Sequence, residues 1–244
     1  MTAWIAFKSI LLKDMKTYYL KPPNISWGLI FPLAWTLMFF LRTKTPVDIQ
    51  TILPGLISLS ILFGTTSMLA VTITFEKKQE AFDRLLLAPI DLNLLMFAKS
   101  SGAVIFGIFN AIVPLLLAVF LTDISAISFL PTITAILLIS ITSTFLGLFI
   151  AVSVKEVFEA QTFSNFFRFP MIFLCGLFIP VADLPAIIRP IAYILPLTYG
   201  ADILKYAING QNIFNIWFNL LILLVFSAVL FLVSIKNIRE KWIV

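Results

Sequence analysis

The stretch 52–75, ILPGLISLSILFGTTSMLAVTITF, contains no charged side chain. A helix needs about 20 predominantly apolar residues to cross the hydrocarbon core of a bilayer. Because lipid offers no hydrogen-bond partners to an exposed backbone, an apolar stretch of this length folds as a helix when it lies in a membrane. The stretch therefore predicts a transmembrane helix.

Similar apolar stretches occur on both sides of this one, and short charged segments separate them. They are Ile25–Leu41, Gly102–Leu121, Phe129–Val154, Phe158–Ile179 and Ile213–Ile235. Hydrophobic residues make up 61% of the chain and charged residues 12%, against roughly 45–50% and about 25% in soluble domains. We predict an all-α polytopic membrane protein, with six transmembrane helices in a single domain over residues 1–244.

Several kinds of chemistry are excluded by composition. The chain has no histidine, and its single cysteine is Cys175, so one copy can form neither a disulfide framework nor a Cys/His metal site. The absence of histidine also excludes a catalytic Ser–His pair. The chain also lacks the GxxxxGK[ST] phosphate loop, so it does not bind ATP in that way. We expect neither catalytic residues nor a metal site nor a bound cofactor.

Basic residues are unevenly distributed between the segments that join the apolar stretches. With six crossings, one side collects twelve of them: Lys8, Lys13, Lys16, Lys21, Lys77, Lys78, Arg84, Lys99, Lys155, Lys236, Arg239 and Lys241. The other side holds only Arg42, Lys44, Arg189 and Lys205. Because positive charge concentrates on the cytoplasmic side, we expect a multi-pass plasma-membrane protein with both termini in the cytoplasm. A nucleic-acid partner would need a basic face on a soluble domain, which this pattern does not provide.

Residues 1–21 form the first segment outside the apolar stretches. Trp4, Phe7, Leu11, Met15 and Tyr18 recur at spacings of three and four, which places them on one helical face. Lysines lie on the opposite face. This pattern favours a helix lying in the cytoplasmic membrane interface, and packing against a partner protein is the alternative.

The segment FEKKQEAFDRLLLAP (75–89) carries the densest charge in the chain. Glu80 and Arg84 have the i,i+4 spacing of a helical ion pair, and Phe82, Leu85 and Leu86 supply an apolar edge. Pro89 ends the helix. The segment is either an ordinary charged loop or a cytoplasmic docking helix for another subunit.

The segment before the last apolar stretch is apolar but interrupted by prolines. Pro180, Pro185, Pro190 and Pro196 recur every five or six residues, and each disfavours a continuous helix. We predict that 180–200 is a re-entrant pair of short helices at the external face, with an interfacial hairpin as the alternative. Arg168 is the best candidate for a charge within the membrane.

Two of these segments also carry a family resemblance. Residues 75–89 resemble the coupling helix of the type-2 ATP-binding-cassette exporters, which include drug-export and polysaccharide-export permeases. Residues 169–210, FPMIFLCGLFIPVADLPAIIRPIAYILPLTYGADILKYAING, resemble the signature region of that family. The order of elements along the whole chain agrees with the resemblance.

The resemblance implies a permease subunit that has no ATPase of its own. It implies a homodimer in the bilayer that works with two cytoplasmic ATPase subunits, which bind ATP and magnesium. ATPase contacts would come from Phe75, Glu76, Lys77, Lys78, Glu80, Phe82, Arg84, Leu85 and Pro89. The substrate path or outer gate would include Phe166, Arg168, Phe169, Gly176, Pro180, Pro185 and Tyr199.

The solute is less well defined by the sequence. The 25 phenylalanines favour a hydrophobic or amphipathic compound, drug-like or lipid-like, and a lipid-linked glycan or polysaccharide is the alternative within the same family. An ion-coupled secondary carrier and a passive channel are alternatives of a different class. A secondary carrier would respond to an ion gradient, and neither alternative would need a docking helix.

Overall fold

The computed structural model describes residues 3–22, 24, 30, 34, 37, 38, 49–121 and 127–242. Throughout these residues every regular element is a helix, which confirms the all-α prediction. In chain order the elements are α1 (Ala3–Asp14), the π-helical turn η1 (Met15–Tyr19), α3 (Ile49–Lys78), α4 (Ala81–Leu86), α5 (Leu92–Leu121), α6 (Phe129–Ser153), α7 (Val157–Leu174), the 3₁₀ turn η2 (Val181–Asp183), α8 (Arg189–Ile194), α9 (Pro196–Asn209) and α10 (Ile216–Trp242).

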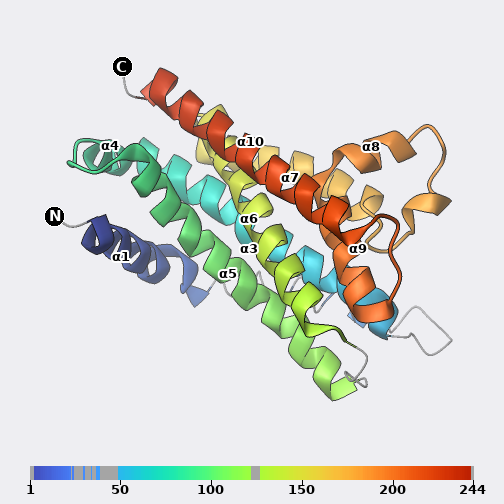
Figure 1. The fold of residues 1–244 in the computed structure, drawn as a ribbon. Coiled ribbons are helices and arrows are strands. Elements are labelled where there is room, and N and C mark those ends of the chain that lie inside the picture. Colours follow the sequence, from blue (N-terminus) through green and yellow to red (C-terminus); the bar gives the residue numbers. More distant parts are fainter. Residues whose placement is uncertain are drawn as a thin grey trace.

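The long helices pack side by side, and each runs in the opposite direction to the one before it (Figure 1). Both termini lie at the same end of this bundle as α4, and α8 and α9 lie at the opposite end (Figure 1). We call these the α4 end and the α8 end. The common end for both termini is compatible with an even number of crossings.

Four of the helices are long and apolar enough to cross a membrane, namely α3, α5, α6 and α10. They correspond to four of the six predicted crossings, although α5 begins at Leu92 rather than at Gly102. The stretch predicted as the fifth crossing forms α7, which ends at Leu174 rather than at Ile179 and is not among these four apolar helices. The first, Ile25–Leu41, lies outside the described residues except at isolated positions. The count of six therefore stays a prediction.

The centre of the bundle is formed by α3 and α6, which contact each other closely. A Cβ atom at Gly147 of α6 would lie only 2.3 Å from the carbonyl oxygen of Thr66 on α3. The Thr66 hydroxyl donates a hydrogen bond of 3.3 Å to the carbonyl oxygen of Ser143. Small residues allow the two backbones to approach, as is usual where membrane helices pack.

The helix α1 packs against α5, and its buried stripe is Ala6, Ile10 and Asp14. The predicted apolar face lies beside this stripe, since Trp4 is largely exposed and Phe7, Leu11 and Met15 are half-buried. The position of α1 in the membrane interface stays a prediction.

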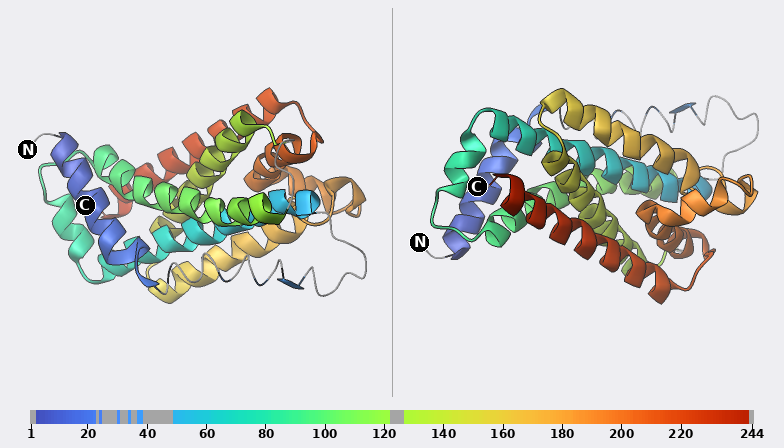
Figure 2. Two further views of the ribbon diagram at one scale, coloured as in Figure 1. Left: turned by 90° about the horizontal axis from the view of Figure 1, so that it is seen from below. Right: turned by 90° about the horizontal axis from the view of Figure 1, so that it is seen from above.

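Residues 180–200 form short helices, as the prolines predict, but the last of them continues beyond this range. The helix α9 runs to Asn209 and packs against α3, α6 and α10 (Figure 2). Eleven of its residues are buried. It is thus an integral part of the bundle at the α8 end. Its re-entry into a bilayer stays a prediction.

Candidate functional site

The segment predicted as one helix over 75–89 consists of two helices. The helix α3 continues through Phe75 to Lys78, and α4 then covers only Ala81–Leu86. Between them Glu80 adopts a left-handed backbone conformation with φ of 58°. Because a left-handed residue interrupts helical hydrogen bonding, α4 turns away from α3 as a separate short helix. This corrects the prediction of a continuous helix.

The outer side of this segment is exposed at the α4 end. We call Lys78, Glu80, Arg84, Leu87 and Pro89, which are all exposed, the α4 surface. The side chain of Leu87 is the most open of the large apolar residues there, at 86% exposure. Lys78, Glu80 and Arg84 place charges of both signs in the same segment as this leucine.

The ion pairs of this segment differ from those expected. In the described part of the chain, Glu80 and Arg84 form no ion pair with each other. Lys77 pairs with Asp83 instead and so holds α4 against the end of α3. The reason is the turn at Glu80, which removes this residue from the regular helix. Both Glu80 and Arg84 therefore remain available at the α4 surface.

Two residues predicted to contact a partner lie inside the protein. Glu76 is 1% exposed and Phe82 is 0% exposed, so neither belongs to the α4 surface. Phe75 is partly exposed, and Lys77 and Leu85 are half-buried. This corrects the expected exposure of Glu76 and Phe82, since both are needed for packing within the chain.

Glu76 belongs to a cluster of charges, which we call the ion cluster: Lys13, Asp14, Glu76 and Lys99. Three of its members are buried, and the Lys13 side chain is 42% exposed. The Lys99 side chain is 0% exposed, and its Nζ hydrogen-bonds to Glu76 and lies 3.1 Å from Asp14 Oδ2. Lys13 Nζ lies 2.5 Å from Glu76 Oε1 and 2.9 Å from Asp14 Oδ1. Two cations thus meet two carboxylates, so the cluster is neutral overall.

The cluster affects the titration of Lys13 on α1. Burial by itself lowers the pKa of Lys13, but its hydrogen bonds to Glu76 and Asp14 raise it, and the net result is a pKa well above the ordinary value. Lys13 therefore carries its positive charge at neutral pH. The cluster holds α1, α3 and α5 together by charge as well as by packing.

Phe82 attaches α4 to the rest of the bundle. Its ring packs edge-on against Trp242 at the end of α10, with 5.1 Å between centroids. Lys99 Nζ lies 5.9 Å from the centre of the Phe82 ring, and Lys77 Nζ lies 5.3 Å from that of Trp242. Because α4 contacts the ion cluster and α10 in this way, a displacement of α4 would strain the ends of α3, α5 and α10 together.

The connection between α6 and α7 also lies at the α4 end. Lys78 Nζ lies 2.5 Å from Glu156 Oε2, which ties the end of α3 to the start of α7. Glu156 and Glu159 form a capping box at that start, in which the backbone N–H of Glu156 donates to Glu159 Oε2 at 3.1 Å. The two glutamates therefore stabilise a helix end.

The residues predicted for a substrate path do not form one site. Arg168 and Phe169 of α7 line a cavity of about 480 Å³, whose lining also includes residues of α3 and Asn24. Phe166 is exposed on another face of α7. The remaining predicted residues lie at the α8 end: Gly176, Pro180, Pro185 and Tyr199.

At the α8 end these residues shape the short helices. The Tyr199 hydroxyl donates a hydrogen bond of 2.7 Å to the carbonyl oxygen of Tyr193, which fixes α9 against α8. Gly176 has a φ of +73°, and a Cβ there would lie 3.1 Å from Val181 and 3.3 Å from the Lys205 ammonium. Glycine is therefore required where the chain leaves α7.

Sequence reasoning did not identify Asp202, which organises the start of α10. Its carboxylate accepts hydrogen bonds from the backbone N–H groups of Ile213 and Phe214 at 2.8 and 3.0 Å. The Asn219 side chain donates a third bond of 2.8 Å. The sequence analysis also did not identify the pairing of Lys99 with Asp14. The position of Lys99 next to the apolar stretch of α5 could have indicated a buried charge that needs a partner.

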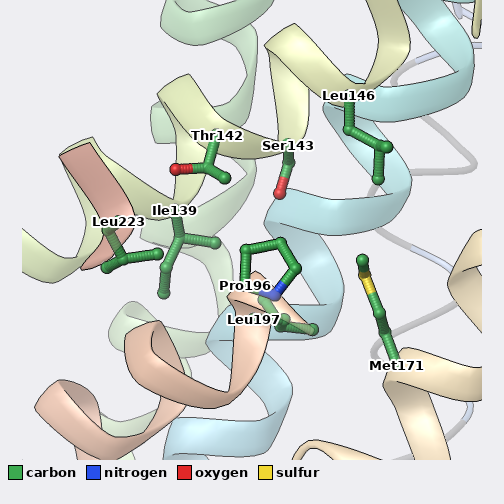
Figure 3. A pocket seen from close by; sticks show the side chains of 8 residues that line it. All are labelled: Ile139, Thr142, Ser143, Leu146, Met171, Pro196, Leu197 and Leu223. Carbon is green, nitrogen blue, oxygen red and sulfur yellow. The ribbon is translucent and has the colours of Figure 1, made fainter. Parts of the chain in front are cut away.

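A second cavity between the helices is too small for an organic solute. Its volume is about 10 Å³, which is close to the space of a single water molecule. Figure 3 shows that its lining comes from α6, α7, α9 and α10, with Thr142 and Ser143 as the polar members. We therefore assign it to helix packing.

Comparison with known proteins gives one family. Residues 5–209 match the family described as "ABC-2 type transporter". The chain is 23% identical to the inner membrane transport permease YadH of Escherichia coli (strain K12) over 245 residues. This alignment covers 97% of this chain and 96% of that protein. It is also similar to the nodulation protein J of Rhizobium leguminosarum bv. viciae, with 36% identity over 72 residues, which is 30% of this chain and 28% of that protein.

Proposed function

The chain belongs to the ABC-2 type transporter family, and on this premise we propose that it is the permease subunit of an ATP-driven exporter. It is a membrane permease with apolar helices, similar over nearly its full length to an inner membrane transport permease. We propose in addition that ATP hydrolysis drives transport, that the solute moves out of the cytoplasm, and that it belongs to the class described below.

The proposed assembly contains two copies of this chain and two cytoplasmic ATPase subunits. ATP and magnesium are bound by the ATPase subunits, because this chain has no phosphate loop. Both termini and the α4 end face the cytoplasm, as the distribution of lysine and arginine favours. The four apolar helices, α7 and the stretch 25–41 make up the six crossings of each copy.

The observation that carries this proposal is the α4 surface. It combines Leu87, the most exposed large apolar side chain of this segment, with the exposed charges of Lys78, Glu80 and Arg84. An apolar anchor surrounded by charges is the arrangement expected of a surface that docks on another protein. A loop that only joined α3 to α5 would not require it.

Coupling would use the inner side of the same segment. Phe82 contacts Trp242 of α10 and lies beside Lys99 of the ion cluster. When the ATPase dimer closes on ATP and moves α4, these contacts pass the displacement to α3, α5 and α10. The contacts of Phe82 couple the ATPase to the transmembrane helices only if the contacts of α4 differ between the two states of the transporter.

The solute we propose is hydrophobic or amphipathic, either drug-like or lipid-like. The cavity between α3 and α7 supports this class, because its volume of about 480 Å³ lies in the range of small-molecule sites. Phe63, Met68 and Phe169 provide apolar walls there.

The experiment that tests the proposal is purification of the tagged chain from its native membrane in mild detergent. We expect an ATPase subunit with a phosphate loop to co-purify in a one-to-one ratio with the chain, and the complex to hydrolyse ATP. The double variant Glu80→Lys/Arg84→Glu should lose most of the bound ATPase while the permease remains folded in the membrane.

A matched control reverses one exposed charge at the opposite end of the bundle. Asp183→Lys changes an exposed acid in the short turn η2 and should retain the ATPase. Equal retention of the ATPase in the α4 double variant and in this control would overturn the α4 surface as the docking site. A preparation that contains no ATPase and moves solute along an ion gradient would support a secondary carrier instead.

A further inference from the structure

The cavity between α3 and α7 contains an arginine that is incompletely paired. Arg168 is 2% exposed, and it lines the cavity together with Asn165 and Gln161 of α7 and with Phe63 and Ser67 of α3. Counted from the ends of these helices, Arg168 lies eleven residues from the start of α7 and Phe63 fifteen residues before the end of α3. At 1.5 Å per residue, both lie deep within the bundle.

The contacts of the guanidinium group leave one of its edges without a hydrogen-bond partner. Nη1 donates a hydrogen bond of 3.3 Å to Asn165 Oδ1, and the group lies over the Phe63 ring at 4.5 Å from its centre. In the described residues Nε and Nη2 have no hydrogen-bond partner. Nor does any carboxylate of those residues form an ion pair with Arg168.

The two unpaired donors, Nε–H and Nη2–H, can bind the same anion. Nε–H and Nη2–H point in parallel along one edge of the guanidinium plane, which is the edge that binds a carboxylate or a phosphate with two hydrogen bonds. Arginine stays protonated in proteins, so it cannot avoid the cost of burial by losing its charge. A buried charge without a counter-ion is unfavourable, and an anion at this edge would remove that cost.

The neighbouring side chains support the same orientation. Asn165 Oδ1 accepts the bond from Arg168 Nη1, and Gln161 Nε2 lies 3.5 Å from the same oxygen. This amide holds the far edge of the guanidinium group, and Phe63 covers one of its faces. The unpaired edge, whose Nε and Nη2 are buried, is therefore the one that remains for a ligand, and the cavity that Arg168 lines also has Met68, Val71 and Phe169 in its walls.

We propose that this cavity binds an amphipathic molecule with an anionic head group, a phosphate or a carboxylate, which Arg168 holds through Nε and Nη2 while the apolar walls hold the rest of the molecule. The inference rests on the proposed function, because it names the class of solute that the permease accepts. The head group belongs either to the transported solute or to a lipid of the bilayer, and the experiment below distinguishes these sources.

The test uses the full chain in nanodiscs of neutral phosphatidylcholine, with radiolabelled dodecyl phosphate as the probe. Dodecanol is the uncharged probe of the same chain length, and empty nanodiscs give the background of lipid partitioning. We expect saturable binding of dodecyl phosphate and none of dodecanol. Arg168→Gln should weaken this binding roughly tenfold to a hundredfold, the range for loss of charge-assisted hydrogen bonds.

Two further variants separate the role of Arg168 from a loss of folding. Arg168→Lys keeps the charge without the two parallel donors and should bind with intermediate affinity. Ser67→Leu keeps Arg168 but fills part of the cavity, and it should also bind more weakly. Arg239→Gln removes an exposed arginine of α10 and should bind as the wild-type chain does.

Equal affinity for dodecyl phosphate in the wild-type chain and in folded Arg168→Gln would overturn the proposal, as would unchanged binding by Ser67→Leu. For the source of the head group, native mass spectrometry is applied to the chain purified from its own membrane. A phospholipid retained by the wild-type chain and lost in Arg168→Gln identifies a bilayer lipid. Binding of the probe with no retained phospholipid identifies a transported solute.

The outcome is independent of the ATPase. Probe binding is measured on the permease alone, so a chain that binds dodecyl phosphate through Arg168 but purifies without an ATPase would support this inference and contradict ATP-driven export. If the chain purifies with an ATPase and Arg168→Gln binds dodecyl phosphate as tightly as the wild-type chain does, the result would support ATP-driven export and contradict this inference.

Discussion

The Nζ atom of Lys99 lies 3.1 Å from Oδ2 of Asp14, although the two residues are 85 positions apart in the chain. Lys99 lies on α5, and Asp14 is the last residue of α1. Both side chains are withdrawn from solvent, and Glu76 of α3 completes the arrangement. Three helices that approach the α4 end are therefore joined by buried charges rather than by apolar packing alone.

The ion cluster should be strongly coupled. Glu76→Gln leaves Lys99 with an incomplete set of partners, and we expect the free energy of unfolding to fall by about 3–5 kcal/mol, the usual result of breaking a buried ion pair. The double variant Glu76→Gln/Lys99→Gln should be less destabilised than the sum of the two single variants. Unfolding by SDS titration in mixed micelles measures all three values, and strictly additive losses would contradict the coupling.

The two sides of the α4 segment should respond differently to truncation. Phe82→Ala removes a fully buried ring that packs on Trp242, and it should lower the free energy of unfolding by about 3–5 kcal/mol. Leu87→Ala removes an exposed side chain, and it should leave the stability unchanged but reduce the amount of ATPase that co-purifies. If Leu87→Ala retained the full amount of ATPase, Leu87 would not be the anchor of the docking surface.

The close approach of α3 and α6 predicts intolerance of any side chain at Gly147. A Cβ there would lie 2.3 Å from the Thr66 carbonyl oxygen, a backbone atom that cannot move without displacing α3. Gly147→Ala should therefore lower the melting temperature of the purified chain in detergent, even though alanine favours a helix more than glycine does. Ala228→Val, which enlarges an exposed side chain of α10, serves as the control and should melt as the wild-type chain does.

Asp202 should be essential for the junction between α9 and α10. Asp202→Ala leaves the backbone donors of Ile213 and Phe214 without their carboxylate, and we expect a loss of about 3 kcal/mol in the free energy of unfolding. Asp183→Ala, at an exposed site of the same end, should have little effect. Limited proteolysis between residues 209 and 216 offers a second measurement, since cleavage there should accelerate only in Asp202→Ala.

The helical architecture and the family follow from patterns that are local in the chain. An apolar run such as 52–75 becomes a helix because the bilayer leaves its backbone no other partner, and the observed α3 contains the whole run. The prolines after Pro180 likewise predict short helices, because each proline removes a backbone donor. The left-handed turn at Glu80 was not predictable in this way, since the surrounding sequence favours a helix and a residue other than glycine rarely adopts this conformation.

The amino-acid sequence by itself determined the class of fold, the apolar helices and the short helices after Pro180, because hydropathy and proline act within a few residues. Only the tertiary structure decided which charged residues are exposed and which are buried. Glu76 and Lys78 lie two positions apart, yet Glu76 meets Lys13 and Lys99 while Lys78 remains exposed. Those partners come from α1 and α5, so the environment of each charge depends on how helices from distant parts of the chain pack together.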